Sequence, residues 1–148
     1  MKIWIIGANG LLGSQLLSYL KNKRINVVGT LRHEADVTDL LQLQEFVKMI
    51  QPSHIINCAA YTDVDGAEKN SELAFAINAK GAEHVAIVAQ DCGARMIHIS
   101  TDYVFNGKQM VPYREMDDCD PINVYGRSKR EGEIKILQVY PQTCIVRT

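Results

Sequence analysis

Short apolar runs alternate along the chain with segments in which apolar side chains recur every three or four residues. The runs predict buried strands at 2–6, 25–29, 54–59, 95–100 and 143–147. The periodic segments predict helices at 10–21, 39–50, 71–91 and 123–140. Residues 36–39 are a candidate for a further short strand and helix cap, and 101–121 form an expected loop. Apolar strands separated by helices are typical of a doubly wound parallel sheet, so we expect a Rossmann-like α/β fold.

Composition narrows the class of protein without naming a chemistry. The 148 residues are 47% hydrophobic and 22% charged, with a formal net charge of −1, which suits one globular domain. We therefore expect no nucleic-acid or membrane partner, since there is no basic excess and no apolar run of about 18 residues. No signal peptide is evident, so a cytoplasmic location is expected. The four cysteines lack metal-ligand spacing, and we expect reduced thiols, no metal, and Cys58 and Cys144 packed in strands.

Three glycines at three-residue spacing follow the first predicted strand and open the first helix. A helix that begins there points free N–H groups and its positive dipole end at the turn, where a phosphate gains from both. Gly7 would permit the tight turn, Gly10 the approach of backbone to a pyrophosphate, and Gly13 the packing of helix on strand. A glycine turn that serves packing alone, with no ligand, stays open as the alternative.

The segment after the second strand offers a cation where many dinucleotide sites place an acidic residue. The segment has no carboxylate before Glu34, and Arg32 could hold a 2′-phosphate, which favours NADP over NAD. Arg32 could equally be a solvated loop residue. Asp36 could accept from an adenine amino group, or it could simply precede a helix that Thr38 or Asp39 caps.

Tyr125 and Lys129 are spaced i and i+4, which puts them on one face of a helix. A nearby ammonium would lower the pKa of the tyrosine and make it a usable proton donor to a carbonyl. The same spacing occurs at Tyr19 and Lys23, so spacing alone is weak, and an ordinary exposed pair is the alternative. Context favours Tyr125, because it follows the strand that ends in Ser100-Thr101, where Thr101 could donate its hydroxyl to a substrate carbonyl.

These residues together resemble the extended branch of the short-chain dehydrogenase/reductase superfamily, and most closely the dTDP-4-dehydrorhamnose reductase family. The resemblance covers nearly all of the chain, and its most specific string is Ser100-Thr101-Asp102-Tyr103-Val104-Phe105. The other segments that carry it are 7–13, 36–39, 57–62, Asn78, 112–115 and 123–129.

The resemblance implies NADPH-dependent reduction of the 4-keto group of a nucleotide-linked 6-deoxysugar, with NADH as a further cofactor. Tyr125 would protonate the oxygen, Lys129 would lower the pKa of Tyr125 and bind the nicotinamide ribose, and Thr101 would orient the carbonyl. Implied cofactor contacts are Gly7, Asn9, Gly10, Leu11, Leu12, Gly13, Arg32, Asp36, Val37, Cys58, Ala59, Ala60, Tyr61, Asn78, Tyr125 and Lys129. Implied substrate contacts are Thr101, Asp102, Val104 and Tyr125. Asn78 has either a structural or relay role, or only local hydrogen bonds.

The family resemblance also bears on domain organisation. Family members continue past residue 148, so we expect 1–148 to be the NAD(P)-binding domain, with most of the substrate-binding domain absent. Cofactor binding would then be weak or moderate, turnover poor, and an exposed sheet edge would favour a homodimer. Two alternatives stay open. One is a non-catalytic NADP-binding regulatory subunit resembling that of methionine adenosyltransferase, and the other is a sugar epimerase or dehydratase of the same branch.

Overall fold

Five parallel strands form one sheet in the order β2-β1-β3-β4-β5. The computed structural model describes residues 1–148. The strands are β1 (Ile3–Ile6), β2 (Val27–Thr30), β3 (His54–Asn57), β4 (Arg95–Ser100) and β5 (Cys144–Arg147). The helices are α1 (Leu11–Asn22), α2 (Leu40–Ile50), α3 (Val64–Lys69), α4 (Ser71–Phe75), the π-helix η1 (Ala76–Gly81), α5 (Ala82–Cys92), the 3₁₀ turn η2 (Asp102–Val104) and α6 (Val124–Val139). The expected Rossmann-like parallel sheet is confirmed.

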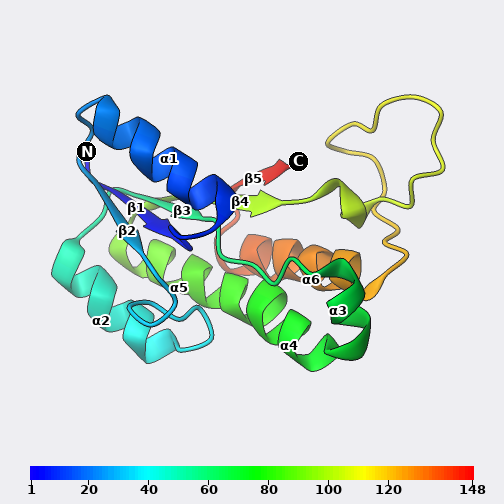
Figure 1. Cartoon of the computed structure of the whole chain (residues 1–148), viewed down its shortest axis with the longest axis horizontal. Coiled ribbons are helices and arrows are strands. Elements are labelled where there is room, and N and C mark those ends of the chain that lie inside the picture. The colour runs from blue at the N-terminus through cyan, green and yellow to red at the C-terminus, as the bar shows by residue number, and fades with distance from the viewer.

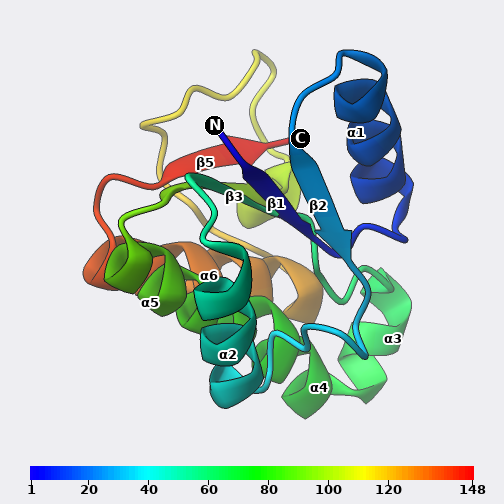
Figure 2. The ribbon, with the colours of Figure 1, turned by 90° about the vertical axis from the view of Figure 1, so that its left-hand side faces the viewer.

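Helices cover both faces of the sheet, but unequally. Figure 1 shows α1 on one face and α2, α5 and α6 on the other, and Figure 2 shows the same two layers from the side. Alternation along β1 divides its side chains between the faces. Trp4 and Ile6 belong to the main core of 16 buried residues under α2, α5 and α6. Ile3 and Ile5 join a smaller cluster against α1, so one strand anchors both layers.

Strand order places a crevice beside β1. The chain leaves β1 for β2 on one side, whereas β3 pairs with the other side of β1. The connections therefore diverge at the carboxyl ends of β1 and β3, which is the switch point where open parallel sheets bind ligands. Register aligns Ile6 with both Thr30 and Asn57, so the loops that follow these strands start at one edge of the sheet.

Three details differ from the sequence predictions. Residues 36–39 form turns and not a strand, because Asp39 caps α2 by accepting from the Gln42 N–H and Asp36 is bonded within the turn. The expected helix 71–91 is interrupted by η1, and α3 precedes it. Cys144 is exposed rather than packed, because β5 is an edge strand, while Cys58 is half-buried and all four thiols are free.

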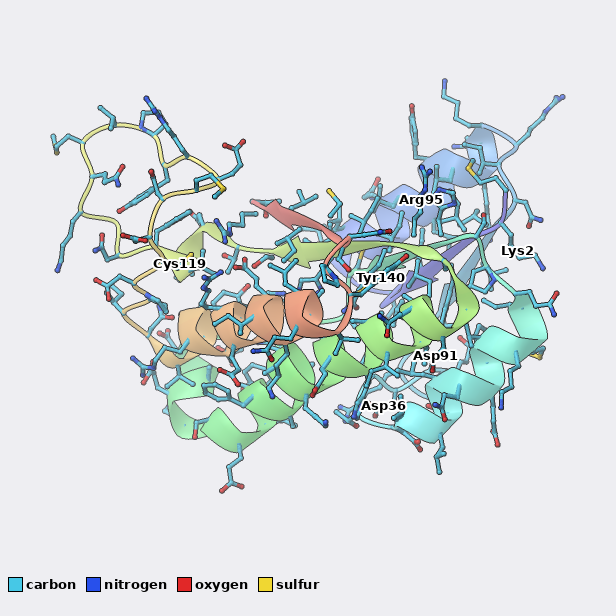
Figure 3. The ribbon with its side chains drawn as sticks, turned by 180° about the vertical axis from the view of Figure 1, so that it is seen from behind. Lys2, Asp36, Asp91, Arg95, Cys119 and Tyr140 are labelled. Carbon is cyan, nitrogen blue, oxygen red and sulfur yellow. The ribbon has the colours of Figure 1, made fainter.

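The long segment after η2 extends away from the helical layers (Figure 1). Cys119 lies on this loop, as Figure 3 shows from behind, and Asp36 lies near the start of α2 in the same view. No helix of the structure combines the length and the apolar character that crossing a membrane requires.

Candidate functional site

The first glycine turn is shaped by close backbone contacts. Gly7 has φ +78°, and a Cβ there would lie 2.8 Å from the Ala59 nitrogen. A Cβ at Gly13 would lie 2.2 Å from the Gly7 carbonyl oxygen, so α1 can approach the turn only because position 13 lacks a side chain. Close backbone packing therefore requires glycine at positions 7 and 13.

Gly10 is different, because packing does not require it. Its φ is −71°, and a Cβ there would meet only the Gly7 oxygen, at 3.4 Å. Gly10 is also the N-cap of α1, with no side-chain cap, and the first turn of the helix carries no acidic residue. The opening N–H groups of α1 thus lack a side-chain partner at the positive end of the helix dipole. This local structure suits an anionic group that approaches the backbone.

The turn opens onto a cavity of about 470 Å³ at the carboxyl ends of β1 and β3. The cavity brings together ten of the residues predicted to bind a cofactor: Gly7, Asn9, Gly10, Arg32, Asp36, Val37, Cys58, Ala59, Ala60 and Tyr61. Ile6, Ala35, Thr62, Asp63 and Ile77 complete its lining. The lining therefore runs from the glycine turn to the segment after β3 and the loop after β2.

The other predicted cofactor residues lie outside this lining: Leu11, Leu12, Gly13, Asn78, Tyr125 and Lys129. The side chain of Leu11 is largely exposed, and Gly13 faces the Gly7 oxygen. The backbone N–H groups of Leu11, Leu12 and Gly13 open α1 and lack helical partners, so they could serve a ligand at the turn.

Arg32 and Asp36 form an ion pair at one end of the cavity. Arg32 Nε lies 2.9 Å from Asp36 Oδ2, and the Arg32 side chain is 68% exposed. Asp36 Oδ1 accepts from both the N–H and the hydroxyl of Thr38. Burial alone would raise the pKa of Asp36, but these bonds and Arg32 together lower it. Both carboxylate oxygens are thus engaged by the loop itself, whereas the guanidinium keeps free donors toward the cavity.

Asn78 ties the cavity wall to α6. Its Oδ1 accepts from the Tyr61 N–H at 2.8 Å, and its Nδ2 donates to the Tyr61 carbonyl and to Ser128 Oγ. The residue is buried within η1, so its amide is occupied by the protein. These side-chain contacts support a structural role: Asn78 holds the backbone of Tyr61, which lines the cavity.

Tyr125 stands at the start of α6, one turn before Lys129. Asn123 caps the helix by accepting from the Gly126 N–H, and the Tyr125 ring meets that of Tyr103 edge-on, with centroids 5.5 Å apart. Burial raises the pKa of Tyr125, and the nearby Thr101 side chain acts in the lowering direction. Thr101 and Tyr125 are therefore neighbours in this structure, and their catalytic roles stay a prediction.

Lys129 does not lower the pKa of Tyr125 in this structure, contrary to the prediction from their spacing. Its Nζ donates to the Ile99 carbonyl at 2.7 Å and lies 3.4 Å from His98 Nε2. Burial lowers the pKa of Lys129 to about 8, although Glu133 and Cys58 act in the opposite direction. The predicted lowering of the Tyr125 pKa by Lys129 is wrong for this arrangement, because the amine bonds to β4 and burial dominates at the phenol.

Val104 also differs from expectation. Val104 is the last residue of η2 and is fully buried, so it offers no surface to a substrate. Asp102 is exposed beside it and accepts from the Thr101 hydroxyl at 3.2 Å. The string Ser100–Phe105 is thus part core and part exposed surface.

The sequence interpretation missed a buried carboxylate next to this region. Glu133 is fully buried and accepts from Ser100 Oγ at 2.6 Å, from Arg130 at 2.8 Å and from Arg147 at 2.8 and 2.9 Å. Arg147 also donates to the Glu115 carbonyl, so one ion network joins α6, β4, β5 and the long loop. The i, i+4 spacing of Lys129 and Glu133 was the available signal, since it puts Glu133 on the inward face of α6.

The fold and the crevice define a class: Rossmann-like α/β domains whose ligand site lies at the carboxyl ends of parallel strands. Residues 1–148 match the family model described as the RmlD substrate binding domain. The chain belongs to this family.

Named relatives agree with that assignment. The dTDP-4-dehydrorhamnose reductase of Mycobacterium tuberculosis is 40% identical over 151 residues, which are 99% of this chain and 49% of that protein. A dTDP-4-dehydrorhamnose reductase of Bacillus anthracis, solved in complex with NADP, has a TM-score of 0.95 and 44% identity over 99% of this chain and 53% of that one. WbmG of Bordetella bronchiseptica, solved with NAD and UDP, has a TM-score of 0.84 and 25% identity over 99% and 52%. The chain spans about half the length of the relatives it matches.

Proposed function

We propose that this chain binds NADP(H) and carries the acid–base residues of a reductase that acts on a nucleotide-linked 4-keto-6-deoxysugar. The observation that carries the proposal is the bare backbone at Gly7 and Gly10, which opens onto the cavity at the switch point. A diphosphate would receive the first N–H groups of α1 there, and Arg32 lies on the same cavity. The names of the relatives favour a reductase over the regulatory-subunit alternative.

The preference for NADPH rests on Arg32. An adenosine 2′-phosphate would add charge that a guanidinium with free donors can bind in a two-point geometry. Asp36 holds Arg32 at the cavity through their ion pair, and its carboxylate already accepts from Arg32 and Thr38. The NADP complex of the Bacillus anthracis relative supports this preference, while the NAD complex of WbmG keeps NADH as the competing cofactor.

The bound nicotinamide would supply a hydride to the keto carbon, and the chain would supply the proton. Tyr125 is the proton donor, since its phenol is half-buried at the start of α6 and interacts with Thr101. Thr101 would orient the carbonyl oxygen, and Asp102 would add a polar contact at the exposed rim. Lys129 lies one turn further along α6, where it would bind the nicotinamide ribose.

Substitution of Tyr125 tests this proposal. Tyr125→Phe removes the proton donor and keeps the ring, so single-turnover oxidation of NADPH with a dTDP-4-keto-6-deoxysugar should slow by about 10²- to 10⁴-fold. Tyr19→Phe is the matched control, since Tyr19 has the same spacing to a lysine, Lys23, on the exposed surface of α1. The assay uses excess chain over substrate, so that a single turnover reports the chemical step apart from product release.

Equal rates in Tyr125→Phe and Tyr19→Phe would remove Tyr125 from the proton-donor role. A fluorescence titration with NADPH on the same samples shows whether the cofactor still binds. Loss of rate with unchanged NADPH affinity is the expected pattern, because Tyr125 lies outside the cavity lining.

A further inference from the structure

Behind the phenol, three buried residues from three different segments form one line of polar atoms. Asn57 Nδ2 lies 3.2 Å from His98 Nδ1, His98 Nε2 lies 3.4 Å from Lys129 Nζ, and that nitrogen donates to the Ile99 carbonyl. All three side chains are almost completely buried. The proposed reaction gives no part to Asn57 or His98.

The backbone after β3 fixes the direction of this line. The Ala59 N–H donates to Asn57 Oδ1 at 3.1 Å, so the Nδ2 group, which can only donate, faces His98. His98 Nδ1 must therefore accept, and a neutral imidazole then carries its hydrogen on Nε2. That Nε2–H points at Lys129 Nζ, which can accept a hydrogen bond only as a neutral amine.

A charged Lys129 requires the opposite arrangement. An ammonium has no lone pair, so His98 Nε2 would have to accept and the hydrogen would move to Nδ1. The Nδ1–H would then face the Asn57 Nδ2 group, and two donors would meet in a buried site with no acceptor between them. Because an unmade buried hydrogen bond is costly, the line of atoms favours the neutral amine.

The groups around Lys129 also affect the equilibrium between its ammonium and its neutral amine. From α6, Glu133 favours the ammonium but is shared with Arg130 and Arg147, and Tyr125 lies one turn away. From the segment after β3, Cys58 faces Lys129, and burial raises the thiol pKa to about 11. From β4 come His98 and the Ile99 carbonyl. Burial, with the charge of Lys129, holds the pKa of His98 well below its ordinary value, so the ring stays neutral near pH 8.

We propose that Asn57 and His98 are positioning residues that couple the charge of Lys129 to the tautomer of His98. The neutral amine goes with Nε2–H, and the ammonium goes with Nδ1–H. The consequence for the site rests on the proposed function: Lys129 lies one turn from Tyr125, so this line of atoms sets the charge that a bound nicotinamide ribose would meet there.

Nitrogen NMR of the histidine rings in the ¹⁵N-labelled chain reads the tautomer directly, because a hydrogen-bearing ring nitrogen and a bare one resonate far apart. Across a titration from about pH 6 to about pH 10, His98 should change from Nδ1–H to Nε2–H. The midpoint should lie near pH 8, where Lys129 loses its proton. His84 is the internal reference, because its Nδ1 lies 2.9 Å from the Val37 carbonyl and must keep its hydrogen.

Lys129→Met is the matched variant, since it removes the amine and keeps an unbranched apolar side chain. In it, His98 should remain Nε2–H at every pH. The inference is overturned if His98 of the unchanged chain carries its hydrogen on one nitrogen throughout, if it becomes an imidazolium, or if the variant switches as the unchanged chain does. The first two outcomes need no variant to fold.

The NMR experiment involves no cofactor, so it separates this inference from the proposed function. A chain that switches tautomer but fails to bind NADPH contradicts only the proposed function. A chain that binds NADPH without the switch contradicts only the coupling.

Discussion

The glycine turn and the region around Lys129 are built in opposite ways. At the turn, Gly7 and Gly13 lack side chains, and backbone atoms occupy the positions that a Cβ would take. Around Lys129, long polar side chains are buried, and each is held by a named partner. Adding a methyl group should therefore destabilise the turn, whereas removing a hydrogen-bond or ion-pair partner should destabilise the Lys129 region.

The largest effect is expected where a buried charge loses its partner. Glu133→Gln leaves Arg147 and Arg130 without their shared carboxylate, so the free energy of unfolding should fall by about 3 to 5 kcal/mol in denaturant titrations. Glu83→Gln is the control, because Glu83 pairs with Lys80 and Lys135 at the surface and should change stability by about 1 kcal/mol or less.

The same carboxylate predicts a pH dependence. Burial would raise the pKa of Glu133, but its bonds from Arg147, Ser100 and Arg130 win and lower it below the ordinary 4.5. The unfolded chain then takes up this proton at higher pH than the folded one, so the stabilisation is complete above about pH 4.5 and is lost as pH falls further. If Glu133→Gln and the unchanged chain lose stability in parallel below that pH, the network does not contribute as described.

The next effect concerns an added methyl group at the turn. Gly13→Ala places a Cβ against the Gly7 oxygen, so α1 must shift, and the free energy of unfolding should fall by about 2 to 3 kcal/mol. Gly10→Ala adds the same methyl group three residues away, where φ is ordinary and the nearest atom is 3.4 Å distant. Equal thermal stability of the two variants would show that the close approach at Gly13 is not a constraint.

A smaller effect sharpens the cofactor preference. Arg32→Ala should weaken NADPH binding about tenfold in fluorescence titrations and leave NADH binding unchanged, because only NADPH carries the 2′-phosphate. Arg95→Ala is the charge-matched control, since Arg95 is exposed at the start of β4, away from the cavity (Figure 3). An equal loss for both nucleotides would assign Arg32 a general electrostatic role.

The sequence predicted the turn well because its constraints are local. The spacing of Gly7, Gly10 and Gly13 and the apolar run before them are contiguous, so strand, turn and helix follow from short-range rules. The alternation of strands and helices likewise predicted the parallel sheet. The break at η1 was not readable, because it accompanies the close approach of Gly132 on α6 to the Asn78 carbonyl, far along the chain.

The Lys129 region was predicted only in part for the same reason. Tyr125 and Lys129 could be paired from their spacing, but the preference of Lys129 for the Ile99 carbonyl depends on how α6 packs on β4. The spacing of Glu133 from Lys129 indicates a shared helix face, but its partners Ser100 and Arg147 are 33 and 14 residues away and cannot be read from that spacing. A helix face is readable from sequence, but the partners of a buried charge are not.

The central claim is that unobstructed backbone at Gly10 holds the diphosphate of NADP(H). The most direct measurement is a calorimetric titration of NADPH into the unchanged chain and into Gly10→Ala, with thermal unfolding of the same samples. The account predicts that Gly10→Ala keeps its stability and loses about tenfold or more in NADPH affinity, because the methyl group projects where the diphosphate must approach. Unchanged affinity in a folded Gly10→Ala chain would contradict the claim.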